Sequence, residues 1–211
     1  MRLIRVAISL IRPLVRAIYW LPLLVVTPIV PVLAGMLGML EDALPPKLAL
    51  VMLRTAGLLL GAAAAYALAD QMAGSTAALP APRWLRQWLR TALAGAYVAL
   101  AWAATYAMVT TRSTGAPPWW DTTVEAAVCV TAGLAGAAFL VRRVSERHAG
   151  SAGAATLIAL LLASLFLPDD RSAWPSTGAP HWDAAHAGWL LALPVLLATL
   201  AIAHRDTRAT P

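Results

Sequence analysis

Charged side chains are scarce in this sequence: they make up 12% of the 211 residues, whereas hydrophobic residues make up 60%. A soluble domain carries about 25% charged residues, so this chain lacks the polar side chains that would cover a surface in water. The shortage excludes an ordinary soluble globular protein, and the hydrophobic content excludes a disordered chain. A lipid bilayer is the solvent that fits both proportions.

Cysteine and the common catalytic motifs are also missing. Cys129 is the only cysteine, which excludes an intrachain disulfide framework. The sequence has no G-x-S-x-G elbow, no H-E-x-x-H pair and no phosphate-binding P-loop, so it does not indicate hydrolase, metalloprotease or nucleotide-binding chemistry. We therefore expect no enzyme activity and no cofactor in this chain. If it works with ATP, the ATPase is another polypeptide.

Apolar segments of membrane-spanning length are what the sequence does contain. A bilayer core requires about 20 mainly apolar residues per helix, and the breaks between segments hold charged residues and prolines whose backbone could not stay in hydrocarbon. The pattern predicts an all-α integral membrane protein that forms a single membrane domain over residues 1–211. Its six predicted spans, of which the last two are short, cover residues 17–40, 48–69, 91–110, 122–141, 149–167 and 187–203.

The basic residues are distributed unevenly between the segments that flank these spans. With the N-terminus placed inside, twelve of the sixteen basic residues fall in inner segments, three fall in outer segments and Arg54 falls within a span. Because an excess of Arg and Lys marks the cytoplasmic side, we expect both termini to be cytoplasmic. The Arg-rich, Ala-rich composition is typical of a GC-rich bacterial genome, so the expected location is the bacterial inner membrane. The net charge of +6 is explained by this bias and does not indicate nucleic-acid binding.

Two inner segments have the spacing of amphipathic helices. In the segment 1–16 the polar residues Arg2, Arg5, Ser9, Arg12 and Arg16 are three or four positions apart and therefore share one helical face. Such a helix lies in the headgroup plane, and Pro13 predicts a bend before the first span. It is interpreted either as an anchor or as an elbow that transmits motion from a cytoplasmic partner.

Residues 82–90 repeat this pattern, with a polar face and two tryptophans on another face. This predicted second interfacial helix is either an anchor or a docking surface for an acidic partner. The inner loop 142–148 is either a tight helical hairpin or a contact for a motor subunit. Together these segments supply the candidate partner-docking residues Arg2, Arg5, Arg12, Arg16, Arg83, Arg86, Arg90, Arg142, Arg143, Glu146 and Arg147.

Few polar groups fall inside the predicted spans. Arg54 and Glu125 both lie toward the outer side, where each could reach the outer headgroups independently or the two could pair. A functional interpretation, that they form a polar spot on a substrate route, also stays open. In the outer loop 168–186, His181, Asp183 and His186 are weak candidates for metal ligands, because nothing in that Pro- and Gly-rich loop fixes a geometry.

Prolines and small residues mark two further features of the spans. Pro22, Pro28 and Pro31 predict a broken or strongly curved first span. Gly57 and Gly61, like Ala132 and Gly136, have the small-xxx-small spacing that allows close helix packing.

The arrangement as a whole resembles a permease subunit of an ABC-2-type ABC transporter. The likeness is carried by the segment Arg2 to Arg16, the six spans and the inner loop Arg142 to His148. It implies a cytoplasmic ATPase partner, a second permease copy or homologue, and a function in export. One departure is that no substantial polar re-entrant segment precedes the last span. Two alternatives stay open: an accessory or scaffold subunit of another membrane complex, and a small channel or carrier, which would require more polar groups at mid-membrane.

Overall fold

The computed structural model describes residues 11–40, 43–68, 83–140 and 148–205. The described chain is helical, and its one β-type contact is an isolated bridge between Leu44 and Ser113. A short helix, Ile11–Ala17, precedes α2 (Leu21–Val26) and α3 (Ile29–Leu40). The longer helices are α4 (Pro46–Ala65, continued by the 3₁₀ turn η1, Tyr66–Leu68), α6 (Arg83–Thr111), α7 (Trp119–Leu140), α8 (Ala149–Leu165) and α9 (Trp182–His204), with the 3₁₀ turn η3 (Asp169–Arg171) before α9.

The helices meet the length and composition requirements of a membrane protein. Among the described residues, four helices are long and apolar enough to cross a bilayer: α4 with η1, α6, α7 and α9. A fifth candidate is the bent pair formed by Ile11–Ala17 and Leu21–Leu37. The helix α8 is apolar but has only 17 residues, at the lower limit for a span. The structure thus supports four or five spans by length, and the fifth predicted span, 149–167, corresponds to the short α8.

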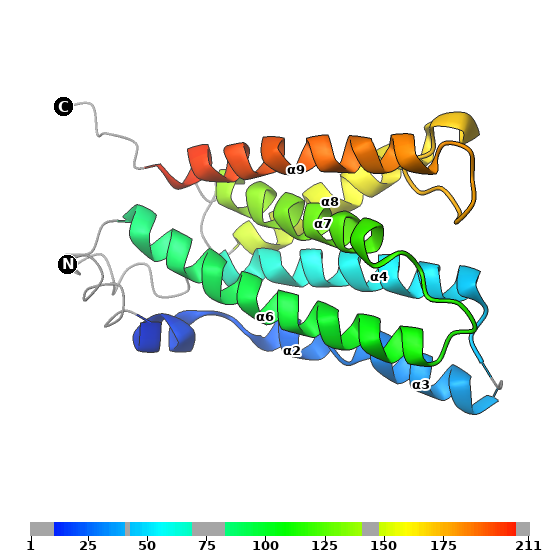
Figure 1. The fold of residues 1–211 in the computed structure, drawn as a ribbon. Coiled ribbons are helices and arrows are strands. Elements are labelled where there is room, and N and C mark those ends of the chain that lie inside the picture. Colours follow the sequence, from blue (N-terminus) through cyan, green and yellow to red (C-terminus); the bar gives the residue numbers. More distant parts are fainter. Residues whose placement is uncertain (1–10, 41–42, 69–82, 141–147, 206–211) are drawn as a thin grey trace.

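The helices lie side by side and run alternately in opposite directions (Figure 1). The helix Ile11–Ala17, the start of α6 and the end of α9 lie at one end of the bundle, on the left in Figure 1; we call it the basic end. We call the other end the loop end, because residues 43–45, 112–118 and 166–181 lie there. In the described chain the loop end carries Asp121, Asp169, Asp170 and Asp183. The separation of charge expected from the sequence is therefore present along the bundle.

The N-terminal part of the described chain is bent, but not at the predicted position. The helix Ile11–Ala17 makes an angle of 69° with Leu21–Leu37, and the break falls at residues 18–20, whereas Pro13 lies within the helix. The break directly precedes Pro22, which occupies the first turn of α2, where its missing N–H is harmless. Ile18 is buried against Ala67 and Ala94, so packing fixes the chain at the break. The expected curvature of the first span is confirmed, with a second break between α2 and α3.

The predicted interfacial helix 82–90 does not form a separate element. It is the first part of α6, a continuous helix of 29 residues. Gln87 and Arg90 are buried, and Arg90 is only 2% exposed. The predicted polar face of this segment therefore turns partly into the molecule, because residues 87 and 90 lie where α6 packs on its neighbours. This corrects the expectation of an exposed surface that includes Arg90.

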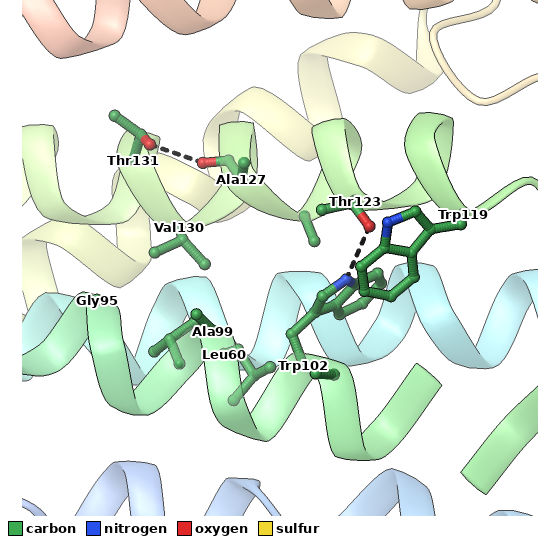
Figure 2. A pocket seen from close by; sticks show the side chains of 12 residues that line it. Leu60, Gly95, Ala99, Trp102, Trp119, Thr123, Ala127, Val130 and Thr131 are labelled. Atoms are coloured by element: carbon green, nitrogen blue, oxygen red, sulfur yellow. Dashed lines mark hydrogen bonds between the residues drawn. The ribbon is translucent and has the colours of Figure 1, made fainter. Parts of the chain in front are cut away.

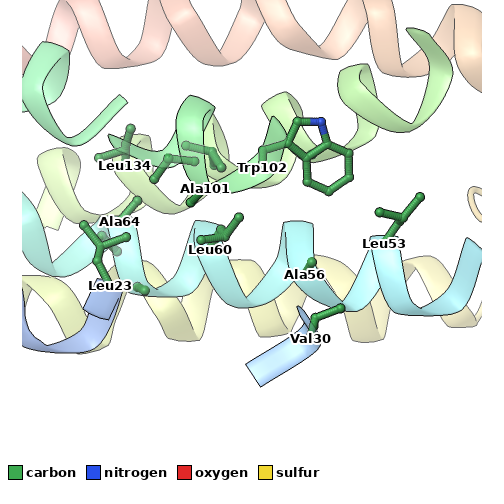
Figure 3. Packing of buried hydrophobic residues seen from close by; sticks show 14 of the residues in the cluster. Leu23, Val30, Leu53, Ala56, Leu60, Ala64, Ala101, Trp102 and Leu134 are labelled. Carbon is green, nitrogen blue, oxygen red and sulfur yellow. The ribbon is translucent and has the colours of Figure 1, made fainter. Parts of the chain in front are cut away.

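The core is centred on α7, which packs against α4, α8 and α9. Leucine, alanine and tryptophan side chains from α4, α6 and α7 meet there, including Leu53, Leu60, Trp102 and Leu134 (Figure 3). The closest approach between α4 and α7 is made by glycines: a Cβ on Gly133 would collide with the carbonyl oxygen of Gly61. The small-residue spacing at Gly57 and Gly61 therefore does allow close packing, as its pattern predicts.

Replacing Gly133 with Ala should destabilise the bundle. The new methyl group would lie less than 3.0 Å from the Gly61 carbonyl oxygen, and such overpacking costs about 1–3 kcal/mol. Thermal unfolding in detergent measures the effect. Gly95→Ala on α6 is the matched control, because a Cβ there meets nothing within 4 Å. Equal midpoints for the two variants would contradict the packing described here.

The expected orientation predicts which end of the bundle faces the outside of the cell. A cysteine replacing the exposed Thr177 at the loop end should react with a membrane-impermeant maleimide in intact cells. A cysteine replacing the exposed Arg205 at the basic end should react only after the cells are opened. The native Cys129 is buried and gives little background. The opposite labelling pattern would reverse the predicted orientation.

Candidate functional site

An ion pair lies between α4 and α7 in the loop-end half of the bundle. Arg54 Nη2 donates to Glu125 Oε1 at 2.7 Å, and Arg54 Nε donates to Glu125 Oε2 at 2.9 Å. The Arg54 side chain is 11% exposed and that of Glu125 is 2% exposed. Two parallel N–H···O bonds of this kind are the strongest arrangement of a guanidinium and a carboxylate. Of the alternatives left open by the sequence, the structure shows the two residues paired with each other.

The loop before α9 covers this pair. Arg54 Nη1 donates to the backbone oxygen of Trp174 at 3.2 Å, and the guanidinium carbon lies 5.6 Å and 5.8 Å from the ring centroids of Trp174 and Trp182. Cation–π contacts of this type strengthen when they are shielded from water. The Arg54 guanidinium is therefore held by α7 on one side and by the loop on the other.

His186, on the first turns of α9, completes the cluster. Its Nδ1 lies 2.8 Å from the backbone oxygen of Trp182. That oxygen can only accept, so the proton is on Nδ1. Its Nε2 lies 3.1 Å from Glu125 Oε1 but is not aligned for a hydrogen bond. Because a carboxylate oxygen is also an acceptor, this contact is attractive only when Nε2 carries a proton as well.

Further hydrogen bonds attach the loop to the helices around the cluster. Trp182 Nε1 donates to Asp121 Oδ2 at 2.8 Å, and Asp121 lies in the first turn of α7, where the helix dipole favours a negative charge. Trp174 Nε1 donates to Ser164 Oγ at the end of α8. Trp189 Nε1 donates to the backbone oxygen of Ala173. Residues of α4, α7, α8 and α9 are thereby joined at the loop end, and we call Arg54, Glu125 and His186, with Trp174 and Trp182, the ion cluster.

The three weak metal candidates are separated in the structure. His186 belongs to the ion cluster, Asp183 is exposed, and His181 lines a different hollow together with Asp170 and Arg171. In the part of the chain that the structure describes, no group of three His, Cys, Asp or Glu side chains is placed to hold a metal ion. Within the ion cluster each oxygen of the Glu125 carboxylate accepts from Arg54, so the two opposite charges compensate each other.

Two larger hollows lie between the helices, and both are apolar. The first, of about 340 Å³, lies between α6 and α7 and includes Leu60, Ala99 and Val130 (Figure 2). One of its few polar contacts is the bond from Trp102 Nε1 to Thr123 Oγ1 at 3.1 Å. The second, of about 560 Å³, lies between α8 and α9 beside Trp174 and Trp189. No Asp, Glu, Lys, Arg or His lines either hollow among the described residues.

The candidate docking residues fall into three groups. Arg12 and Arg16 are exposed on the helix Ile11–Ala17, whose Leu14 is buried, as expected for an amphipathic helix. Arg86 is half-buried and Arg90 is buried on α6, while Arg83 is the first residue of that helix. The remaining candidates lie outside the described residues: Arg2, Arg5, Arg142, Arg143, Glu146 and Arg147.

His186 and the Trp174 backbone were not assigned to this cluster from the sequence. His186 was placed in the outer loop, because the apolar run starts at residue 187, whereas α9 begins five residues earlier, at Trp182. The helical spacing of Trp182, His186 and Trp189 would have been the signal. No spacing rule could have indicated that a backbone oxygen of the loop would meet Arg54.

Comparison with protein-family models, with curated proteins and with solved structures gave no match to this chain.

Removing one partner of the ion pair should be costly. Leaving a buried charge without its partner costs about 3–5 kcal/mol, so Glu125→Gln and Arg54→Gln should each lower the unfolding midpoint strongly. The exchange Arg54→Glu with Glu125→Arg should restore only part of the loss, because the contacts to Trp174 and His186 are not rebuilt.

The exposed ion pair at η3 is the matched control for these changes to the buried pair. Arg171 and Asp170 lie 3.9 Å apart with side chains 81% and 78% exposed, so Arg171→Gln should leave the midpoint unchanged. The double variant Arg54→Gln with Glu125→Gln completes the comparison. If its loss of unfolding free energy equalled the sum of the losses in the two single variants, the two residues would not interact and the ion pair would be contradicted.

Proposed function

We propose that this chain is a membrane-embedded permease subunit of an ATP-driven transporter, an exporter that works with a separate cytoplasmic ATPase. The observation that carries the proposal is the basic N-terminal elbow. The helix Ile11–Ala17 turns by 69° into the first apolar pair and presents Arg12 and Arg16 at the basic end. A helix in this position, joined through a fixed bend to a span, suits the transfer of movement from a cytoplasmic subunit to the membrane helices.

The interior of the bundle supports a subunit that does not transport alone. The described helices are packed through glycine and alanine around α7, and their hollows are apolar. The charged side chains of the ion cluster compensate one another and are covered by the loop. A route for a substrate would therefore form between this chain and a second permease copy, as the predicted dimer requires.

The apolar hollows also favour a second candidate function, that of an accessory subunit in another membrane complex. An apolar surface with indentations can receive helices of another membrane protein. This candidate gives no role to the elbow, and for that reason we place it second. The two functions differ in the partner that they require.

Purification in mild detergent from the native host distinguishes the two functions. A tagged chain should bring down a stoichiometric P-loop ATPase together with a second copy or homologue of the permease. Hydrolysis of ATP by this complex would then be measured with and without candidate substrates. A membrane partner without any ATPase would overturn the permease proposal and establish the accessory function.

Removing the basic side chains of the inner loop 142–148 predicted from the sequence should abolish binding of the ATPase without affecting membrane insertion. Changing Arg142, Arg143 and Arg147 to Ala should abolish copurification of the ATPase, because the inner loop loses its basic contact. Arg112→Ala and Arg171→Ala at the loop end are the controls and should retain the partner. Unchanged copurification by the triple variant would exclude this loop as the docking contact.

A further inference from the structure

We propose that the chain has a binding site for the headgroup of an anionic phospholipid at its basic end, in the hollow between the start of α6 and the end of α9. This hollow measures about 310 Å³ and is lined by Trp84, Trp88, Ala201, His204 and Arg205. It is separate from the ion cluster, which lies at the other end of the bundle. The inference does not depend on the proposed transport function.

The lining is preorganised by contacts between α6 and α9. The rings of Trp88 and His204 meet edge to face, with centroids 4.8 Å apart, and His204 is buried at the end of α9. Trp84, one turn before Trp88, is 40% exposed. Indole rings at the end of a membrane helix occupy the headgroup level, so the hollow opens where a phospholipid headgroup lies.

The charge of this region is complementary to a phosphate. The described side chains at the start of α6 and the end of α9 include Arg86, Arg90, His204 and Arg205, and no acidic residue stands among residues 84–90 or 201–205. Arg205 is exposed and lines the hollow. A guanidinium has five N–H donors, so Arg205 can bind a phosphate in addition to its contacts within the chain. Basic hollows between membrane helices on the cytoplasmic side are the setting in which anionic lipids bind.

The neighbouring surface fits the acyl chains of the same lipid. Leu191, Val195 and Ile202 are exposed at helical spacing along α9. Ile202 directly follows the lining residue Ala201, and Leu191 and Val195 lie nearer the middle of the helix, where they also line the hollow between α8 and α9. Most of the apolar stretch of α9 is exposed among the described residues, since only 11% of it is buried. A phospholipid would thus contact Arg205 with its phosphate and α9 with its chains. A soluble phosphate would use only the first contact, and an acidic peptide would not follow the apolar face.

The test uses the full chain in detergent micelles to which phosphatidylglycerol or phosphatidylcholine is added. Native mass spectrometry counts the bound lipids, and thermal unfolding reports the stabilisation that they produce. The wild-type chain should retain phosphatidylglycerol in preference to phosphatidylcholine. Arg205→Gln should weaken the binding of phosphatidylglycerol about tenfold, because a hydrogen bond to a charged group contributes about 1.5 kcal/mol or more.

Two matched arginine variants distinguish binding at this site from general electrostatic attraction between the basic chain and the anionic lipid. Arg12→Gln removes an exposed charge at the same end but outside the hollow, and Arg171→Gln removes one at the loop end; both should bind phosphatidylglycerol as the wild type does. Equal losses for Arg205→Gln and Arg12→Gln would overturn the proposal in favour of unspecific attraction. Equal retention of phosphatidylcholine, or stabilisation by inorganic phosphate as large as that by the lipid, would overturn it too.

Discussion

A charge that is buried among apolar helices has to be compensated inside the protein, and the architecture of this chain follows from how Glu125 meets that requirement. The carboxylate lies six residues into α7 and Arg54 eight residues into α4, about 9 Å and 12 Å from the helix starts at 1.5 Å per residue. Hydrocarbon offers neither of them a partner. Because the pair can form only if α4 and α7 lie side by side in one register, the pair selects the relative position of these two helices.

Small residues make that register sterically feasible. Arg54, Gly57 and Gly61 follow one face of α4, and Glu125, Ala126, Cys129 and Gly133 follow the facing side of α7. The ion pair is thus the loop-end member of a continuous contact between the two helices, in which the backbones touch at Gly61 and Gly133. The start of α9 lies against the same carboxylate, with His186 Nε2 3.1 Å from Glu125 Oε1, and the loop that follows α8 is attached through the backbone oxygen of Trp174, which accepts from Arg54. One pair of charges thereby organises α4, α7, the loop and α9.

The sequence predicted the class of fold well and the local departures poorly. The length of the apolar segments predicted the helices, and the asymmetry of charge predicted which breaks lie at the same end of the bundle. Both patterns follow directly from the properties of a bilayer. The bend at residues 18–20 and the continuity of α6 were not predicted, since tertiary packing of Ile18 and Arg90 decides both. For the site, the pairing of Arg54 with Glu125 stayed open, because sequence gives the depth of a residue but not the direction of its side chain around the helix axis.

The ionised state of the buried Glu125 is the central claim, and infrared spectroscopy tests it most directly. The difference spectrum between the wild-type chain and Glu125→Gln, both in lipid vesicles, isolates the signal of this one side chain. The account predicts that the wild-type spectrum contains an additional carboxylate stretching band. If the carbonyl band of a protonated acid appeared in its place, the ionised state would be contradicted, because a neutral Glu125 could not form the ion pair with two hydrogen bonds from Arg54.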